Sequence, residues 1–150
     1  PDAWSSDRIG ERQSGFERWL ASRGWSPDDS RKGAARAAQL LTRTLASVDG
    51  RWVLRRRDDS AAELALTKLG AGGTARVGVV DRCFVEDGVR WIIDYKTADL
   101  GENADIEMLA EHAQRFRPQL ESYAGLFAAE GLPQRLAVFY VAHGILASLE

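Results

Sequence analysis

The dipeptide Asp87-Gly88 constrains the fold of this chain more than any other feature. It separates two segments rich in valine, isoleucine and aromatic residues, the first ending at Glu86 and the second beginning at Val89. Asp-Gly in that setting is a strong hairpin signal, because a type I′ turn needs positive φ at both central residues. The pattern therefore predicts an antiparallel hairpin over residues 76–97, with Glu86 paired to Val89.

The predicted register brings two acidic side chains together. Counting back along both strands from the turn places Asp81 directly opposite Asp94. Side chains alternate along a strand, so Lys96 shares the face of Asp94. Directly opposed side chains lie roughly 5 Å apart at Cβ, and two like charges there destabilise a hairpin unless something lies between them. The other face is expected to be a core layer made of Val80, Phe84, Trp91, Ile93 and Tyr95.

This acidic face has two interpretations. One is a solvated hairpin face on which Lys96 pairs with Asp94. The other is a site for a hard divalent cation, because such ions prefer oxygen ligands. Both acids interrupt continuous apolar runs, which are typical of strands buried on both faces. Since a buried unpaired carboxylate is costly, the flanking residues favour the cation site.

Length and composition exclude several classes of protein. The 150 residues are 45% hydrophobic, enough for one domain with its own core, and the net charge of −2 gives no global attraction to a polyanion. The single cysteine, Cys83, excludes an internal disulfide and a four-cysteine metal site within these residues. No apolar run approaches the ~20 residues that span a bilayer, and no signal peptide is visible. We expect a cytoplasmic protein without a membrane partner.

Two helices and a strand are predicted before the hairpin. Residues 4–23 carry apolar side chains at helical spacing, and Ser26-Pro27 has the residue types of a helix cap and first turn. The second helix is expected to end at Asp49-Gly50. A first strand follows over Ala61–Leu69, and residues 70–73 are expected to form a turn.

Residues 51–57 are the one basic cluster of the chain. We expect a solvated loop in which Asp58 and Asp59 balance Arg55, Arg56 and Arg57. The alternative is contact between these arginines and a phosphate backbone.

A helical region and a last strand are predicted after the hairpin. Asp105 is expected to cap a helix whose apolar positions include Met108, and Pro118 to interrupt it, because an interior proline clashes with the preceding turn. A second helical segment continues to about Glu130, and residues 135–142 read as a buried strand. The order helix, helix, strand, strand, strand, helix, strand predicts an α/β fold, with a mixed sheet flanked by helices.

Three blocks of sequence resemble a known family. They read GVVDR from Gly78, IIDYKT from Ile92 and RPQLESYA from Arg117. Their order and spacing are similar to those of PD-(D/E)XK nucleases, and more narrowly of the nuclease domain at the C-terminal end of RecB and AddA helicase-nucleases of the UvrD/Rep superfamily. The resemblance covers roughly residues 61–142. It implies a restriction-endonuclease-like core, in a single nuclease domain over 1–150 with a helical lead-in (1–57) and a nuclease core (58–142).

The resemblance also implies an activity. The expected protein is a Mg²⁺-dependent DNA exonuclease, with Mn²⁺ as an alternative metal and no iron–sulfur cluster, working within an ATP-dependent helicase-nuclease in double-strand break repair and recombination. Asp81 and Asp94 are the expected metal ligands, and the family pattern adds the carbonyl of Tyr95. Lys96 would position the attacking water or balance the scissile phosphate.

Two further residues match the family's Q-x-x-x-Y pattern. Gln119 and Tyr123 lie four apart and so share one helix face. The resemblance implies that they contact the DNA backbone or orient Lys96; the alternative is a polar residue at the edge of a core face beside a core aromatic. Glu63 stands where relatives carry an acid before the hairpin, and is either a supporting acid or a surface carboxylate.

One departure from the family pattern concerns histidine. Relatives carry a metal-binding histidine on a helix upstream of the hairpin, whereas His112 and His143 both follow it. We expect that histidine to precede Pro1, which would leave the metal site within 1–150 incomplete and the isolated fragment weakly active or inactive.

The expected partners are DNA, the helicase domains of a larger parent chain and a second AddB-like or RecC-like subunit. No ATP-binding P-loop pattern occurs in these residues, so a motor would lie elsewhere in that parent. The alternative function is a catalytically incomplete nuclease-like domain that binds DNA or a partner subunit.

Overall fold

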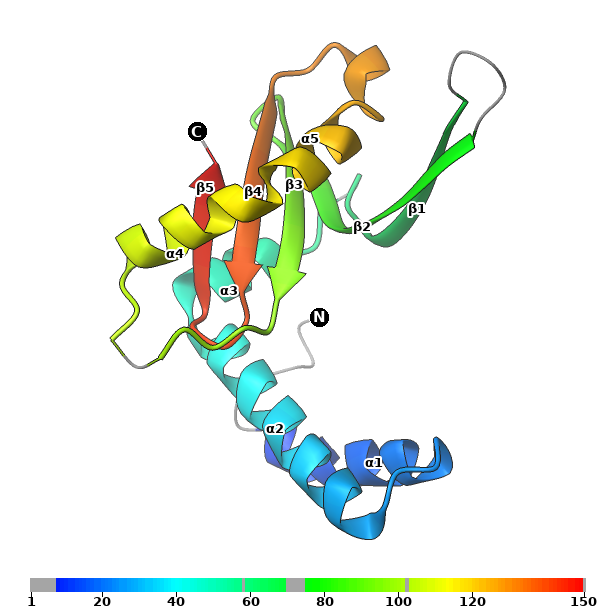
Figure 1. Ribbon diagram of the computed structural model, residues 1–150, viewed down its shortest axis with the longest axis vertical. Coiled ribbons are helices and arrows are strands. Elements are labelled where there is room, and N and C mark those ends of the chain that lie inside the picture. The colour runs from blue at the N-terminus through cyan, green and yellow to red at the C-terminus, as the bar shows by residue number, and fades with distance from the viewer. Residues whose placement is uncertain (1–7, 58, 70–74, 102, 150) are drawn as a thin grey trace. The chain divides into compact units, whose positions relative to one another are not determined.

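The structure is a computed structural model that describes residues 8–57, 59–69, 75–101 and 103–149. It divides into two compact units, one of Pro1–Arg55 with Val141–Gly144 and one of Arg56–Tyr140 with Ile145–Glu150. The first unit contains helices α1 to α3, and the second contains the sheet with α4 and α5 (Figure 1). Within the described residues, no helix combines the length and apolar character needed to cross a membrane.

The first unit begins with two helices, α1 (Ile9–Ser22) and α2 (Pro27–Ala46). The hydroxyl of Ser26 accepts a hydrogen bond from the amide of Asp29 at 3.1 Å, and a proline occupies the first turn of α2. The cap satisfies one of the amide groups that the first turn of a helix leaves free. The predicted start of this helix is therefore confirmed.

The predicted end of the second helix at Asp49-Gly50 is wrong. α2 ends at Ala46, and Ser47 caps a further short helix, α3 (Val48–Leu54), by accepting a hydrogen bond from the amide of Gly50 at 2.9 Å. A Cβ on Gly50 would lie 2.0 Å from the carbonyl oxygen of Thr44. The glycine therefore serves a close approach between two helices and does not terminate one.

The basic cluster differs in part from the expected solvated loop, since Arg55 and Arg56 are exposed and lie outside helices and strands as expected. Residues 51–54 are helical, and the Arg57 side chain is only 8% exposed. Its guanidinium donates to the carboxylate of Glu86 at 2.9 Å and lies 3.7 Å from the ring centroid of Phe84. Glu86 is therefore a partner of Arg57 that the sequence did not predict. The expected balance by Asp58 lies outside the described residues.

The second unit is built on a five-stranded sheet in the order β1-β2-β3-β4-β5. The strands are β1 (Ala61–Leu69), β2 (Ala75–Glu86), β3 (Val89–Lys96), β4 (Gln134–Tyr140) and β5 (Ile145–Leu149). β3 and β4 run parallel, and the other neighbours are antiparallel. The predicted α/β class, a mixed sheet with helices, is confirmed.

β2 and β3 form the predicted hairpin. Asp87 and Gly88 have φ of 52° and 74°, the signs that a type I′ turn requires. Glu86 pairs with Val89 as expected, and the ladder extends to the pair of Arg82 with Ile93. It stops there, one position short of the expected pair of Asp81 with Asp94.

The alternation of side chains along β2 breaks at Asp81. Val80 and Cys83 belong to the same core cluster, although strict alternation would send them to opposite faces. The β1–β2 ladder skips the position where Glu63 faces Asp81, and Glu63 has a φ of 50°. The prediction that Val80 shares the face of Phe84 is therefore wrong.

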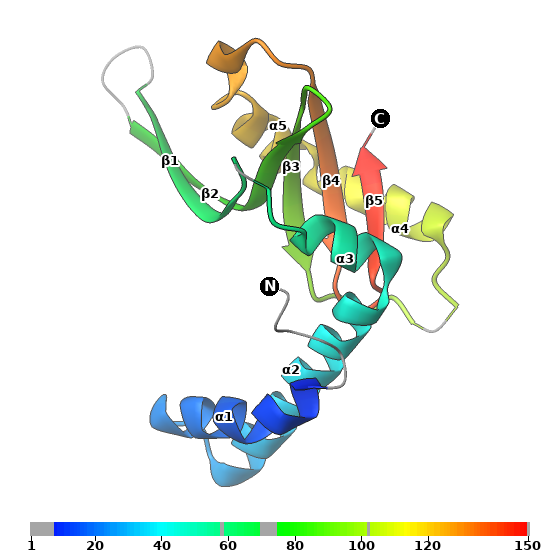
Figure 2. The same cartoon turned by 180° about the vertical axis from the view of Figure 1, so that it is seen from behind.

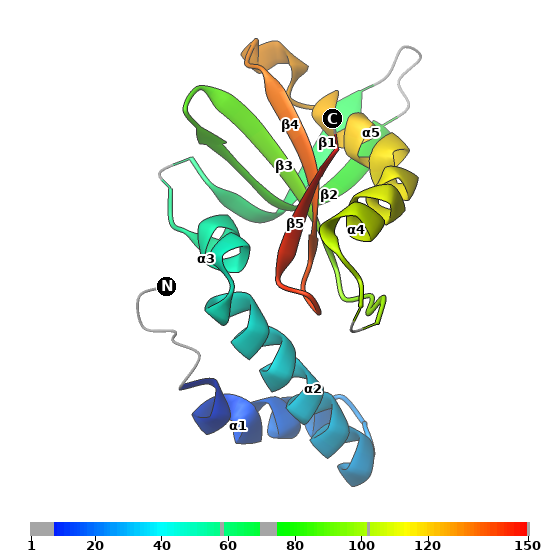
Figure 3. The ribbon, with the colours of Figure 1, turned by 90° about the vertical axis from the view of Figure 1, so that its left-hand side faces the viewer.

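Two helices lie along one face of the sheet, α4 (Ile106–Ala113) and α5 (Arg117–Ala124), as Figures 1 and 3 show. Asp105 caps α4 as predicted, accepting a hydrogen bond from the amide of Met108 at 2.9 Å. A 3₁₀ turn (Gln114–Phe116) separates the two helices. Pro118 lies in the first turn of α5, where its missing amide hydrogen costs nothing, so the predicted interruption is confirmed.

Three details of this half of the chain differ from expectation. Met108 is 48% exposed and is not part of the apolar face. α5 ends at Ala124 and not near Glu130, because the following amides bond to carbonyls three residues back and tighten the chain into turns. β4 ends at Tyr140, two residues before the predicted end, and β5 was not predicted.

The core of this unit lies between the two helices and the sheet. Figure 2 shows the unit from behind, with α4 and α5 on the far side of β3, β4 and β5. The buried cluster joins residues of both helices to residues of the strands and consists of Val80, Cys83, Ile92, Leu109, Ala113, Leu120, Phe127, Val138, Tyr140, Ala147 and Leu149. Polar side chains that enter this layer therefore need partners.

Candidate functional site

The residues predicted to be catalytic come together in the second unit. Asp81 lies on β2, Asp94 and Lys96 on β3, and Gln119 and Tyr123 on α5. Hydrogen bonds, one ion pair and electrostatic effects connect them, as the following paragraphs describe. The two strands of the hairpin and a helix that follows them in the sequence thus supply one polar cluster against an otherwise apolar layer.

Asp94 is the centre of this cluster. It is 4% exposed, and its Oδ2 lies 2.6 Å from the Nζ of Lys96. Burial raises the pKa of Asp94 above its ordinary value; the Lys96 ammonium lowers it in part, and the charge of Asp81 raises it further. Oδ2 makes this ion pair without the geometry of a hydrogen bond, so it is a buried oxygen with unused acceptor capacity.

Asp81 reaches the neighbouring strand through its side chain. Its Oδ2 accepts a hydrogen bond from the backbone amide of Tyr95 at 2.8 Å. A carboxylate thus takes the place of a ladder carbonyl, which explains why the expected pair of Asp81 with Asp94 is missing from the ladder. The two carboxylates are still close enough for the charge of Asp81 to raise the pKa of Asp94.

Gln119 links the strand to the helix. Its amide nitrogen lies 3.3 Å from Oδ1 of Asp94 and 2.9 Å from the hydroxyl oxygen of Tyr123. The Tyr123 ring packs on the backbone of Gly78, where an added Cβ would lie 2.8 Å from the ring carbon Cε1. The spacing of four that predicted a shared face thus also produces a direct contact.

The donor set fits a hard divalent cation. Two neighbouring carboxylates, one of them with a buried oxygen that lacks a hydrogen bond, are oxygen ligands of the kind that Mg²⁺ and Mn²⁺ take. Among the described residues, no group of three or more His, Cys, Asp and Glu side chains is placed to hold a metal. A site of this kind suits an ion that keeps several waters, as Mg²⁺ does.

Tyr95 and the two histidines have other surroundings. The Tyr95 ring packs edge-on against Phe139 at a centroid distance of 6.0 Å, and burial raises the pKa of its hydroxyl to about 12. The role of its carbonyl as a third ligand stays a prediction. His112 lies on α4, with Nδ1 2.7 Å from the hydroxyl of Tyr140. His143 belongs to the first unit.

Two residues beside the site were not anticipated there. The Nζ of Lys96 lies 4.4 Å from the ring centroid of Phe116, and Tyr140 is the β4 partner of Lys96 in the parallel ladder. Phe116 lies within the helical region predicted after the hairpin, but no sequence signal tells which side chain an aromatic ring covers. Glu63 is exposed, which agrees with the surface-carboxylate alternative.

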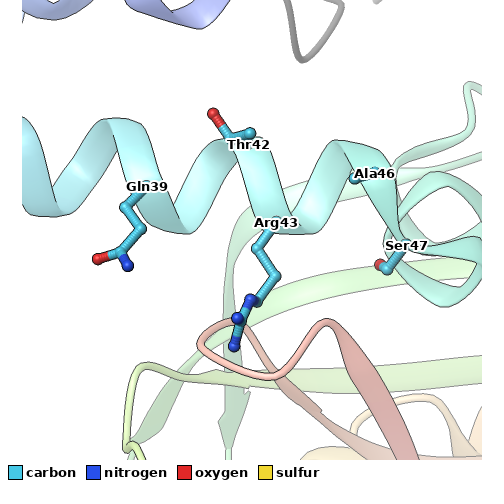
Figure 4. A pocket seen from close by; sticks show the side chains of 5 residues that line it. All are labelled: Gln39, Thr42, Arg43, Ala46 and Ser47. Carbon is cyan, nitrogen blue, oxygen red and sulfur yellow. The ribbon is translucent and has the colours of Figure 1, made fainter.

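The first unit has a pocket of its own along α2. Figure 4 shows the residues that line it, and the Arg43 side chain reaches toward the Val141–Gly144 turn, where it donates to the carbonyl of Ala142 at 2.7 Å. The pocket contains none of the predicted site residues, so the polar cluster of the second unit is the better candidate.

Comparison with known proteins identifies the sequence pattern. The profile of the PD-(D/E)XK nuclease superfamily matches residues 4–146. None of the curated proteins compared with the chain matches it significantly. The profile match spans the three sequence blocks as well as both carboxylates, the lysine and the following helix.

Proposed function

The chain belongs to the PD-(D/E)XK nuclease superfamily, and from that premise we propose that it is a metal-dependent deoxyribonuclease. The observation that carries the proposal is Asp94: a nearly buried carboxylate with an oxygen that lacks a hydrogen bond, beside a second carboxylate and an ammonium group. A purely structural role leaves this arrangement unexplained, because burial of an acid against an apolar layer is unfavourable. Membership of the superfamily suggests a nuclease.

In this proposal Asp81 and Asp94 hold the metal, Mg²⁺ or Mn²⁺, together with the carbonyl of Tyr95. A bound ion of this kind polarises a phosphoryl oxygen and lowers the pKa of a bound water. Lys96 orients the attacking water or balances the charge of the phosphate, since its ammonium group lies 2.6 Å from Asp94. Gln119 maintains the orientation of the Asp94 carboxylate through Oδ1, and Tyr123 holds Gln119.

The proposal extends to a more specific role. The three sequence blocks resemble RecB and AddA nuclease domains, so we propose an exonuclease within a cytoplasmic helicase-nuclease that acts in break repair and recombination. Its partners would be DNA, helicase domains and an AddB-like or RecC-like subunit. The net charge of −2 supports this, because a domain without a general attraction for DNA benefits from a motor that delivers the strand. In this view 1–57 is a helical lead-in and 58–142 the nuclease core.

One observation favours the alternative of a domain that binds without cutting. The described residues offer two acidic side chains at the site but no third metal-binding side chain. His112 is engaged with Tyr140. Two carboxylates without an imidazole would bind the metal weakly, and weak binding would leave cleavage slow.

Digestion of end-labelled single-stranded DNA distinguishes the two functions. We expect slow cleavage by residues 1–150 that depends on added Mg²⁺ or Mn²⁺, is seen at saturating metal and disappears in Asp94→Ala. Asp99→Ala, which changes an exposed aspartate five positions later, is the matched control and should cut like the wild type. DNA binding without cleavage at saturating metal would support the alternative, and equal cleavage by Asp94→Ala would exclude the proposed site.

A further inference from the structure

Lys96 has a second neighbour that attracts its charge. Its Nζ lies 4.4 Å from the centroid of the Phe116 ring, inside the ~6 Å range over which an aromatic face attracts a cation. The Lys96 side chain is 25% exposed, so solvent screens this attraction less than at an open surface. The ammonium group is therefore held from two directions, by the Asp94 carboxylate and by the ring.

A series of contacts with neighbouring residues holds the Phe116 ring in place. Phe116 closes the 3₁₀ turn before α5, and the His112 ring meets it edge-on at a centroid distance of 5.5 Å. The Nδ1 of His112 lies 2.7 Å from the hydroxyl of Tyr140, which is fully buried and pairs with Lys96 in the β3–β4 ladder. The contacts thus form a closed loop that begins and ends at Lys96 and fixes the ring relative to it.

The Asp94 carboxylate and the Phe116 ring, which both attract Lys96, respond differently to a metal. A divalent cation on Asp94 would neutralise the carboxylate and repel the ammonium group, so the ion pair would weaken when the site is loaded. The ring carries no charge that a metal neutralises, and its attraction persists. Without the ring, Lys96 would be released at the stage where the proposed reaction needs it.

We propose that Phe116 is a positioning residue that keeps the Lys96 ammonium group in place when the Asp94 carboxylate is occupied or neutralised. The geometric part of this proposal is independent of any activity. Its consequence for cleavage rests on the proposed nuclease function. The experiment therefore has one arm that does not need cleavage and one that does.

The first arm is NMR of ¹³C-labelled lysine in the 150-residue chain. The chain has only three lysines, Lys32, Lys68 and Lys96, so the ε-methylene signals can be assigned with Lys96→Arg. We expect the ring current of Phe116 to move the Lys96 signal upfield of exposed Lys32. The shift should be lost in Phe116→Leu and retained in Phe116→Tyr.

Asp94→Asn tests the geometric part of the proposal, because it removes the charge of the carboxylate that pairs with Lys96. We expect the Lys96 signal to remain upfield in this variant. Collapse of the signal to the position of Lys32 would show that the ion pair alone places Lys96 and would overturn the proposal. An unchanged signal in Phe116→Leu would overturn it as well.

The second arm measures cleavage with one, two and three fluorines introduced on the ring at position 116, which weaken the negative face of the ring with little change of shape. We expect kcat to fall stepwise, by about 3- to 30-fold over the series, with KM unchanged. A packing role would not follow the number of fluorines, so equal kcat values would contradict positioning through the ring face. If the wild type does not cleave even at saturating Mg²⁺ or Mn²⁺, the proposed function fails for these residues and the NMR arm alone decides the role of Phe116.

Discussion

Asp94 is 4% exposed and lies in a layer whose other buried members are nearly all apolar. Burial and the nearby charge of Asp81 raise its pKa, and the Lys96 ammonium group offsets only part of that rise. The folded protein therefore holds this proton more tightly than the unfolded chain does. If the proposed function is correct, an ionised Asp94 is kept at a cost in stability, as is common for groups in active sites.

The first prediction concerns how the stability cost of ionising Asp94 depends on pH. Because the folded-state pKa lies above the ordinary value of 3.8, the contribution of Asp94 to the free energy of unfolding falls as pH rises from 3.8 through the raised pKa and then levels off. Asp94→Asn should therefore be more stable than the wild type at pH 7, and the difference should vanish below pH 3.8. Urea unfolding over a pH series measures this. A less stable variant at pH 7 would mean that the Lys96 ion pair outweighs burial.

The second prediction concerns the charged pair. Asp94→Ala and Lys96→Ala should each reduce cleavage by about 100-fold or more, because they remove groups that act on the reacting phosphate or its metal. Circular dichroism should show an intact fold, since neither side chain supplies apolar core. Lys32→Ala, an exposed lysine of the first unit, is the matched control. Undiminished cleavage in either site variant would refute the assigned roles.

The third prediction separates chemistry from packing on the segment after β3. Phe127 is 6% exposed, and Phe127→Ala should lower the free energy of unfolding by about 3–5 kcal/mol. Tyr123→Phe removes a hydroxyl that accepts one hydrogen bond from Gln119, so its stability should change by about 1 kcal/mol at most while cleavage falls. Thermal shifts of equal size in the two variants would assign the Tyr123 hydroxyl to the structure.

At the scale of elements, β2 must approach α5 closely to form the site, and Gly78 permits that approach. An added Cβ would lie 2.8 Å from Cε1 of Tyr123, so the fourth prediction is that Gly78→Ala displaces the ring and with it Gln119. We expect a loss of about 1–3 kcal/mol in stability together with reduced cleavage. Gly15→Ala on α1, where the added Cβ meets nothing within 4 Å, is the control. Wild-type cleavage by Gly78→Ala would show that the contact does not matter.

Elements whose signals are local were predictable from the sequence. The turn at Asp87-Gly88 fixed the register, because its backbone geometry depends on its own two residues. The caps at Ser26 and Asp105 and the interruption at Pro118 are equally local. At the two caps, the side chain that gives the signal also accepts the stabilising hydrogen bond.

Elements that depend on distant partners were not predictable. The break in alternation at Asp81 arises where β1 carries Glu63 at positive φ, which residues around Asp81 do not encode. β5 is five residues long and becomes a strand by pairing with β4. Gly50 has the residue type of a helix stop, yet its role is to approach the Thr44 carbonyl.

At the scale of the whole molecule, the sequence predicted which residues of the candidate site lie together, but it did not predict the contacts between them. The hairpin register and the resemblance brought Asp81, Asp94 and Lys96 together with the α5 pair. The bond from the Tyr95 amide to Asp81 and the ring of Phe116 over Lys96 depend on how three segments meet in space. Such contacts follow from tertiary packing, which no single stretch of sequence records.

The last prediction concerns the affinity of residues 1–150 for metal. The proposed ligands are two carboxylates and one carbonyl, and Lys96 already competes for Oδ2 of Asp94 at 2.6 Å. Mg²⁺ held by so few protein ligands keeps its waters and binds weakly, so we expect a Kd of about millimolar by isothermal titration and correspondingly slow cleavage. Asp94→Asn should abolish binding.

Lys96→Met tests the competition directly. Removing a positive charge next to the ligand oxygen should tighten Mg²⁺ binding by about tenfold while cleavage is lost, because the metal and the ammonium group attract the same carboxylate. The midpoint of thermal unfolding should then rise more steeply with Mg²⁺ in Lys96→Met than in the wild type, since a ligand that binds only the folded state stabilises it. Tight stoichiometric binding by the wild type, with rapid cleavage, would show that these residues hold a complete metal site. Unchanged binding in Lys96→Met would show that the metal does not share Asp94 with the lysine.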